Sequence, residues 1–350
     1  MAIFGLNGIG MDLGSMQTSI YLASEEELVL REPTQVLVNA DNISEILCVG
    51  NDARAMVGRT SRDTELINPI QNGVVADIDL TALLMLALAE KATGRKKPME
   101  KALLVTGLMG GATRVERGAL FQAMNATGAK RTAAVLNPIA AALGAEMDIE
   151  KPRGTLIASL GGGATEIAVL SMNSVVALRM LRFGGQSMDE AIVRWYWREK
   201  GIIIGMRTAE QLKREIGTVN AEDVDQDDDP VLLKGKEAAT GRPMSLETTG
   251  LDVMQALEDP VRQLVDAMRN ALYNIPAELA VDIHRNGIQL TGGGALLRGL
   301  PERLEKETGV SVHMSEHPRE DVALGLGRAA SDEKLLNSLA RSGAAELTAE

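Results

Sequence analysis

The sequence predicts an α/β protein built as two similar lobes. Its 350 residues exceed what one ordinary hydrophobic core holds, and two domains suit this length. Short apolar strands alternate with segments of helical periodicity, which is typical of α/β folds. One strand–turn–strand pattern also occurs twice, so we expect the two lobes to be related.

Composition and charge narrow the class of protein. Hydrophobic residues make up 45% and charged residues 24%, the profile of a soluble globular chain. The net charge of −12 argues against a nucleic-acid partner, because phosphate binding needs a basic face. No run approaches the ~20 apolar residues that span a bilayer, and the N-terminus lacks the basic segment of a signal peptide. The single cysteine, Cys48, fits a reducing cytoplasm.

The apolar pattern predicts the main elements in chain order. Alternating and short continuous apolar runs indicate strands, whereas apolar residues three and four apart indicate helices. Strands are expected within Ile9–Leu22, Leu103–Val105 and Thr155–Leu170, and helices at Val115–Ala126 and Val261–Leu272.

The repeated unit aligns Asp12–Ile20 with Ser159–Ile167. Leucine, glycine, threonine and isoleucine coincide at a constant offset. The shared pattern is short, so a chance match stays open as an alternative. A true duplication would place two equivalent turns in two lobes that face each other.

Glycine turns at the centre of both copies suggest a phosphate site. Gly14 and Gly161–Gly163 leave few side chains in the way, so backbone N–H groups can approach an anion closely. Hydroxyl groups at Ser15, Thr18 and Thr165 can add hydrogen bonds. A single Gly-rich hairpin is more often plain structure, but a matched pair favours a clamp that holds a polyphosphate from both sides.

A third glycine turn, Gly292–Gly294, follows a short strand at Ile288–Leu290 and opens a helix near Ala295. Backbone amides at a helix N-terminus favour an anion or the close approach of a ligand. The alternative is a tight turn without a ligand, although three glycines exceed what such a turn requires. No Gly-Lys-Ser/Thr follows, so the segment is not a Walker A motif.

A charged pair lies on a further predicted helix, which Thr208 caps with Gln211 three residues on, as in a capping box. Glu210 and Lys213 share one face of this helix because they are three residues apart. Such a pair could hold the hydroxyls of a ribose. From composition alone, an exposed ion pair of small energetic value is the more common interpretation.

Seven segments, in family order, resemble the sequence landmarks of the MreB family of bacterial actin homologues. Each segment is short, but the set is specific and is compatible with a divergent paralogue. The segments span roughly residues 8–330. They are Gly10–Thr18, Asn68–Asp77, Gly161–Glu166, Arg207–Gly217, Thr240–Pro243, Gly287–Leu300 and Val322–Gly327.

This resemblance implies an actin-like ATPase fold with two duplicated ribonuclease-H-like lobes and four subdomains. Subdomain IA would comprise residues 1–30, 75–145 and 320–345, and subdomain IB residues 31–74. Subdomain IIA would comprise residues 146–185 and 250–319, and subdomain IIB residues 186–249. The nucleotide of such a fold lies in the central cleft.

The resemblance also implies ATP and Mg²⁺ as cofactors and filaments made of the chain itself. Such filaments lie in the cytoplasm, at the inner face of the plasma membrane, and direct cell shape and cell-wall synthesis. The expected partners are further copies of the chain, the membrane surface, and membrane proteins of cell-wall synthesis or morphogenesis. Nucleic acid is not expected.

The resemblance assigns the site residues by motif position. Asp12 would contribute to the magnesium site through water, and Asp12, Asn137 and Ser159 are the candidate catalytic residues. The phosphates would lie between Gly14, Ser15, Met16, Gln17 and Thr18 on one side and Gly161, Gly162, Gly163 and Ala164 on the other. Glu210, Gln211, Leu212 and Lys213 would contact the ribose, and Gly292, Gly293, Gly294, Ala295 and Leu296 would form the adenosine side.

Two positions depart from the family pattern. Ser159 stands where the family has an aspartate, and serine leaves a weaker shell because Mg²⁺ prefers carboxylate oxygens. Asn137 stands where the family has the glutamate that polarises the attacking water. An amide can orient water but cannot accept its proton at neutral pH. We therefore expect ATP binding with slow or absent hydrolysis.

Other functions stay open. A specialised paralogue that positions an organelle or a plasmid would carry the same motifs. A sugar kinase shares the fold but needs a catalytic aspartate and a sugar pocket, for which the sequence has no signature. A chaperone-type ATPase would need a peptide-binding domain after the second lobe.

Membrane contact is expected to depend on charge. In the segment Thr93–Met99 only Met99 is apolar, whereas Arg95–Lys97 is basic and suits either lipid headgroups or a solvated loop tip. The apolar stretch Met1–Leu6 could enter a membrane surface or lead into the first strand.

Overall fold

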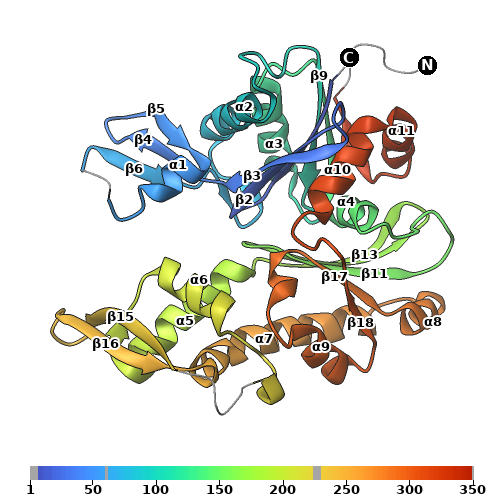
Figure 1. Ribbon diagram of the computed structural model, residues 1–350. Coiled ribbons are helices and arrows are strands. Elements are labelled where there is room, and N and C mark those ends of the chain that lie inside the picture. Colours follow the sequence, from blue (N-terminus) through green and yellow to red (C-terminus); the bar gives the residue numbers. More distant parts are fainter. Residues whose placement is uncertain (1–6, 60–61, 224–229, 349–350) are drawn as a thin grey trace.

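The computed structural model describes residues 7–59, 62–223 and 230–348. The Met1–Leu6 stretch, considered above for membrane contact, lies outside these ranges. Figure 1 shows two lobes, one above the other in this view, each with a central sheet and a smaller sheet at its outer end. In the described ranges, none of the helices combines the length and the apolar composition that crossing a bilayer requires.

The upper lobe is organised by a six-stranded sheet in the order β19-β10-β9-β1-β2-β3. Its strands alternate between two cores, so that Leu104 packs with α2 and α3 whereas Leu103 and Val105 pack with α4 and α10. The strands are β1 (Asn7–Leu13), β2 (Gln17–Leu22), β3 (Glu27–Pro33), β9 (Ala102–Leu108), β10 (Arg131–Leu136) and β19 (Ala345–Leu347). The helices are α2 (Ile78–Thr93), α3 (Arg114–Ala126), α4 (Asn137–Gly144), α10 (Asp321–Ser331) and α11 (Glu333–Arg341).

The lower lobe has a five-stranded sheet in the order β13-β12-β11-β17-β18. One face is covered by the long helix α7, whereas Ile157 and Ala168 on the other face pack towards α4 and α10. The strands are β11 (Thr155–Leu160), β12 (Thr165–Ser171), β13 (Ser174–Leu181), β17 (Ile288–Thr291) and β18 (Val312–Met314). The helical segments are α7 (Gly250–Tyr273), α8 (Ala277–Asn286), the 3₁₀ turn η2 (Gly293–Leu296) and α9 (Leu300–Thr308).

A small sheet extends each lobe on the same side of the molecule (Figure 1). The ranges predicted for the four subdomains stay a prediction, but the small sheets fall within residues 31–74 and 186–249. The upper one contains β4 (Val36–Asn39), β5 (Asn42–Val49) and β6 (Thr64–Ile67), followed by the hairpin β7 (Ile70–Gln71) and β8 (Val74–Val75), with α1 at Gly50–Ala55. The lower one contains β14 (Ile202–Ile203), β15 (Val231–Glu237) and β16 (Pro243–Thr248), with α5 (Gly185–Lys200), α6 (Met206–Glu215) and η1 (Ala221–Asp223).

The internal repeat is confirmed by the strand register. Leu13 pairs with Thr18 in the first copy, and the aligned residues Leu160 and Thr165 pair in the second. Each first strand also has a parallel neighbour on its other side, β9 in one lobe and β17 in the other. The two sheets therefore share the strand arrangement of a duplicated unit, and the two-lobed α/β fold is confirmed.

Helices α4 and α10 lie between the two sheets and join the lobes through one buried core. Their backbones touch at glycines. A Cβ atom at Gly144 would lie 1.8 Å from the carbonyl oxygen of Asp321, and one at Gly325 would lie 1.8 Å from that of Ala140. No side chain fits at either contact, so glycine at these two positions allows the helices to cross this closely.

One predicted helix start was wrong, and one confirmed helix begins earlier than its predicted range. The helix predicted at Thr208 begins at Met206, with Gly205 as its N-cap, so Thr208 does not cap it. The helix predicted from Val261 begins at Gly250, where Thr249 forms a capping box with Asp252. It passes through Pro260 because buried side chains before and after the proline continue one apolar face.

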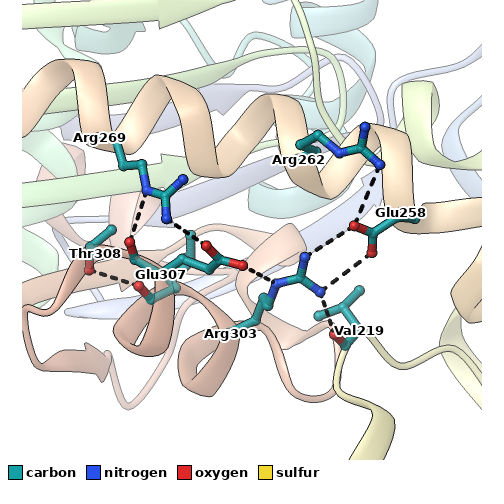
Figure 2. Close-up of polar contacts among 8 residues, drawn as sticks. Val219, Glu258, Arg262, Arg269, Arg303, Glu307 and Thr308 are labelled. Carbon is teal, nitrogen blue, oxygen red and sulfur yellow. Dashed lines mark hydrogen bonds and ion pairs between the residues drawn. The ribbon is translucent and has the colours of Figure 1, made fainter.

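Figure 2 shows the polar contacts that join α9 to α7 and to the segment that follows α6. Arg303 donates to Glu258 of α7 and to Glu307 of its own helix, both at 3.1 Å, and to the carbonyl of Val219 at 3.5 Å. Arg269 pairs with Glu307 at 2.6 Å. The Arg303 side chain is only 24% exposed, so solvent screens this network less than an ordinary surface ion pair.

The crossing of α4 and α10 predicts a large effect of one methyl group. Gly325→Ala should destabilise the protein by about 1–3 kcal/mol, because its Cβ meets a backbone oxygen that cannot move without shifting α4. Urea unfolding measures the change.

Gly118 is the matched control, since it lies within α3 and has open space around its Cβ position. Gly118→Ala should stabilise by about 0.5–1 kcal/mol, the usual gain in a helix interior. Equal stability changes in the two variants would contradict the close crossing.

Candidate functional site

One cavity of about 490 Å³ opens between the lobes and brings most of the predicted site residues together. Both copies of the repeat, the charged pair on α6 and the third glycine turn contribute to its walls. The predicted residues that line it are Asp12, Gly14, Ser15, Met16, Gln17, Asn137, Ser159, Gly161, Gly162, Gly163, Ala164, Glu210, Lys213, Gly292, Gly293, Gly294 and Leu296.

The two repeated turns touch each other across the cavity. A Cβ atom at Gly162 would lie 2.4 Å from Met16 Cγ, and one at Gly163 would lie 2.5 Å from Ser15 Oγ. Each turn is closed by the same bond, from Gly14 N–H to the Gln17 carbonyl and from its repeat partner Gly161 to Ala164. The amides of the residues between, two in each turn, donate to no acceptor among the described residues. Such amides form a concave donor surface that suits an anion.

Both turns are supported from behind. Gly73, at the tip of the β7–β8 hairpin, donates its N–H to Ser15 Oγ at 2.8 Å, which leaves the hydroxyl hydrogen of Ser15 free. The first amides of α5, at Gly185 and Gln186, donate to the carbonyls of Gly161 and Gly162 at 3.0 and 2.8 Å. The carbonyls of the second turn are therefore held by hydrogen bonds to the start of α5.

The charged pair on α6 reaches the cavity, as its spacing predicts, but both residues already have protein partners. Lys213 Nζ lies 2.7 Å from Asp189 Oδ1 and donates to the Gly185 carbonyl at 2.8 Å. Burial raises the pKa of Asp189 to about 6, although Lys213 acts in the opposite direction. Glu210 accepts from Arg54 at 2.9 Å. Because Arg54 lies on α1, this ion pair joins the outer ends of the two lobes across the mouth of the cavity.

The third glycine turn packs against the second repeat and α10. A Cβ atom at Gly292 would lie 2.3 Å from the Leu160 carbonyl oxygen, and φ is +84° there, so glycine is required. Gly292 N–H donates to the Pro318 carbonyl at 2.6 Å. The buried carboxylate of Asp321, at the start of α10, accepts from the hydroxyls of Thr291 and Ser315. These bonds fix the turn to the helix that joins the lobes.

Five predicted residues do not line the cavity: Thr18, Thr165, Gln211, Leu212 and Ala295. The buried hydroxyl of Thr165 donates to the Phe183 carbonyl at 2.9 Å. The Thr18 hydroxyl is buried and bonded inside the upper lobe, and Gln211 is exposed on the outer face of α6. The side chains of Leu212 and Ala295 are buried in the core of the lower lobe. Helical geometry explains why Gln211 and Leu212 do not reach the cavity: side chains one and two positions after Glu210 point to other faces of the helix.

Two carboxylates in the cavity, Asp12 and Glu166, are largely desolvated. The Asp12 side chain makes no hydrogen bond or ion pair with any described residue, and burial raises its pKa to about 7. Burial also raises the pKa of Glu166 to about 7, although Gly110 N–H and Asn137 Nδ2 donate to it. Neither carboxylate has a cationic partner among the described residues, although Arg298 and Arg319 also line the cavity.

Several lining residues were not predicted, among them Arg54, Gly73, Glu166, Asp189 and Arg319. A signal existed for Glu166, because it lies within the repeated unit and ends the family segment Gly161–Glu166. Arg54 and Asp189 had none, since their partners in the site are distant in sequence.

Comparison with known proteins shows what the whole chain is similar to. Residues 6–338 match the family model described as MreB/Mbl protein. The cell shape-determining protein MreB of Escherichia coli strain K12 is 35% identical over 328 residues, which cover 92% of this chain and 93% of that protein. The cell shape-determining protein Mbl of Bacillus subtilis strain 168 is 34% identical over 322 residues, covering 91% and 94%.

Solved structures share the fold. MreB5 of Spiroplasma citri bound to AMPPNP has a TM-score of 0.88 and 27% identity over 97% of this chain and 99% of that one. The MamK double helical filament has a TM-score of 0.75 and 19% identity over 93% and 98%, a likeness that shows the fold alone. The actin-like ATPase fold is therefore confirmed.

Proposed function

The chain belongs to the MreB/Mbl protein family, and on that basis we propose that it binds ATP and assembles into filaments that direct cell shape and cell-wall synthesis. The observation that carries the proposal is the pair of matched glycine turns facing each other across one cavity. The Spiroplasma citri relative holds AMPPNP or ADP in its crystal structures, which supports a nucleotide here. The curated relatives are cell shape-determining proteins, which supports the same role.

The phosphate end of the cavity suits a nucleotide with Mg²⁺. Backbone amides at Ser15, Met16, Gly162 and Gly163 can donate to phosphate oxygens from both lobes. Asp12 has an unpaired carboxylate, and a nearby cation would lower its raised pKa. No cluster of three His, Cys, Asp or Glu in the described residues could hold a metal ion alone, so phosphate oxygens and water would complete the shell. When bound, Mg²⁺ neutralises phosphate charge.

The other end of the cavity would hold the nucleoside. Glu210 and Lys213 would bind the ribose, and the Gly292–Leu296 turn would flank the base. Arg54 would then pair with Glu210 behind the bound nucleotide and hold the outer ends of the lobes together.

We infer that hydrolysis is slow. Ser159 and Asn137 line the cavity at the positions where the family pattern has acidic residues. A neutral hydroxyl binds the shell of Mg²⁺ more weakly than a carboxylate does, and an amide cannot accept the proton of the attacking water.

The filaments would lie in the cytoplasm at the inner face of the plasma membrane, together with membrane proteins of cell-wall synthesis or morphogenesis. Arg95, Lys96 and Lys97 are exposed and suit anionic headgroups. Met99 is buried, so it offers no apolar anchor beside them. A paralogue that positions an organelle or a plasmid would also form filaments, but would not restore rod shape to a cell that lacks its own family member.

Electron microscopy of the purified chain with ATP, ADP or no nucleotide tests the proposal, with and without vesicles that contain anionic lipid. Filaments should form with ATP and should decorate the vesicles. Replacing Arg95, Lys96 and Lys97 with alanine should reduce decoration but leave filaments in solution intact. Absence of nucleotide binding, measured with a fluorescent ATP analogue, would refute the proposed function.

Slow hydrolysis is tested by phosphate release. The wild-type chain should release phosphate at least about 10-fold more slowly than the double variant Asn137→Glu, Ser159→Asp, because the variant restores the two acidic residues of the family pattern, one of them in the magnesium shell. Equal rates would show that the two substitutions do not limit turnover.

The ion pair across the cavity mouth predicts faster nucleotide release when it is removed. Arg54→Ala should speed release of a fluorescent ATP analogue by about 2- to 5-fold, the value of a partly exposed ion pair. The difference should shrink as salt is added. Arg59→Ala is the control, because Arg59 makes no ion pair among the described residues. Equal release from both variants would show that Arg54 does not hold the nucleotide in.

A further inference from the structure

Glu166 is a buried carboxylate at the junction of the lobes that the predicted site did not include. It lies on β12 of the lower lobe and is 4% exposed. Gly110 N–H donates to its Oε1 at 2.7 Å, and Asn137 Nδ2 donates to its Oε2 at 3.1 Å. Both donors come from the upper lobe, after β9 and at the start of α4. A carboxylate has about four acceptor positions, so two stay available.

The contact with Glu166 orients Asn137. The amide nitrogen must face the carboxylate, because the reverse orientation would bring two acceptors together. Asn137 Oδ1 therefore points elsewhere, and it is buried without a hydrogen-bond donor among the described residues. A Cβ atom at Gly107 would lie 2.2 Å from this oxygen, so a glycine is needed beside it. Asn137, Glu166 and Gly107 all line the cavity.

Within the described part of the chain, no cation neutralises Glu166. Strand pairing places Ser159 and Met180 on the same sheet face, and neither is charged. The loop after β9 and the start of α4 contribute only the amide donors already named. Asp12, a second carboxylate without an ion-pair partner among the described residues, also lines the cavity. Burial therefore raises the pKa of Glu166 to about 7, a value that suits proton transfer near neutral pH.

We propose that Glu166 is the general base for ATP hydrolysis in this chain and that Asn137 positions the Glu166 carboxylate through its Nδ2 hydrogen bond. The inference rests on the proposed ATP site. A water that donates one hydrogen to Glu166 keeps a lone pair free to attack the γ-phosphorus. The water oxygen bonds to phosphorus as the bond from phosphorus to the bridging oxygen breaks, and ADP leaves with that electron pair. The water proton passes to Glu166 and then to solvent.

Two residues thus divide a task that one glutamate performs in the family pattern. Turnover stays slow because Ser159 still leaves the magnesium shell weak. The alternative is that Glu166 only ties the lobes together through its two hydrogen bonds. In the structural role, residue 166 needs only hydrogen-bond acceptors. As a general base it needs an ionisable carboxylate.

Glu166→Gln separates the two roles. Glutamine can still accept from Gly110, and the Asn137 amide can turn to accept from the new side-chain nitrogen. Phosphate release should fall by about 100-fold or to the rate without protein, since the lost base is worth at least this much. Affinity for a fluorescent ATP analogue should change by less than about 3-fold, and the urea midpoint should not fall, because removing a buried charge costs no stability.

The double variant Glu166→Gln, Asn137→Glu tests for rescue. It exchanges the amide and the carboxylate of this contact, so that position 137 carries the carboxylate. Its phosphate release should be well above that of Glu166→Gln.

Two results would overturn the inference while leaving the proposed function intact. They are unchanged phosphate release by Glu166→Gln and a lost rate that Asn137→Glu does not restore. Each assumes that the fluorescent ATP analogue binds. If it binds neither the wild type nor the variants, the proposed function fails first.

Discussion

The close crossing of α4 and α10 is the constraint on which the rest of the structure depends. Gly144 and Gly325 allow each helix to meet a backbone carbonyl of the other, with no side chain between them. The helices thereby hold two sheets against one shared core. Because α4 begins at Asn137 and α10 at Asp321, the crossing also sets both helix starts beside the cavity. The lobes cannot shift at this point without moving the site.

The cavity is electrostatically incomplete without a ligand. At one end, unpaired backbone amides lie near two carboxylates, Asp12 and Glu166, whose pKa values burial raises to about 7. A phosphate chain with its metal ion would give the amides an anion and Asp12 a cation. At the other end, charged side chains already pair with protein groups, as in the contact of Arg54 with Glu210. Binding there would therefore exchange protein partners for ligand partners.

Errors in the predicted elements have a common physical origin. A proline usually ends a helix, yet α7 continues through Pro260 because apolar side chains on either side are buried against the same sheet. Thr208 with Gln211 has the pattern of a capping box, but α6 already begins at Met206. Local propensities are worth about 1 kcal/mol each, and burial of a whole helix face exceeds them.

The sequence by itself determined the features that local chemistry controls. The repeat predicted two matched turns, because glycine spacing and strand pattern fix a hairpin locally, and the aligned register confirms it. The resemblance to the family pattern also identified Asn137 and Ser159 as departures from it. Only the tertiary structure decided that Glu166 meets Asn137 and that Arg54 meets Glu210. Those contacts join residues far apart in the chain, so they depend on how the lobes pack and leave no periodic signal.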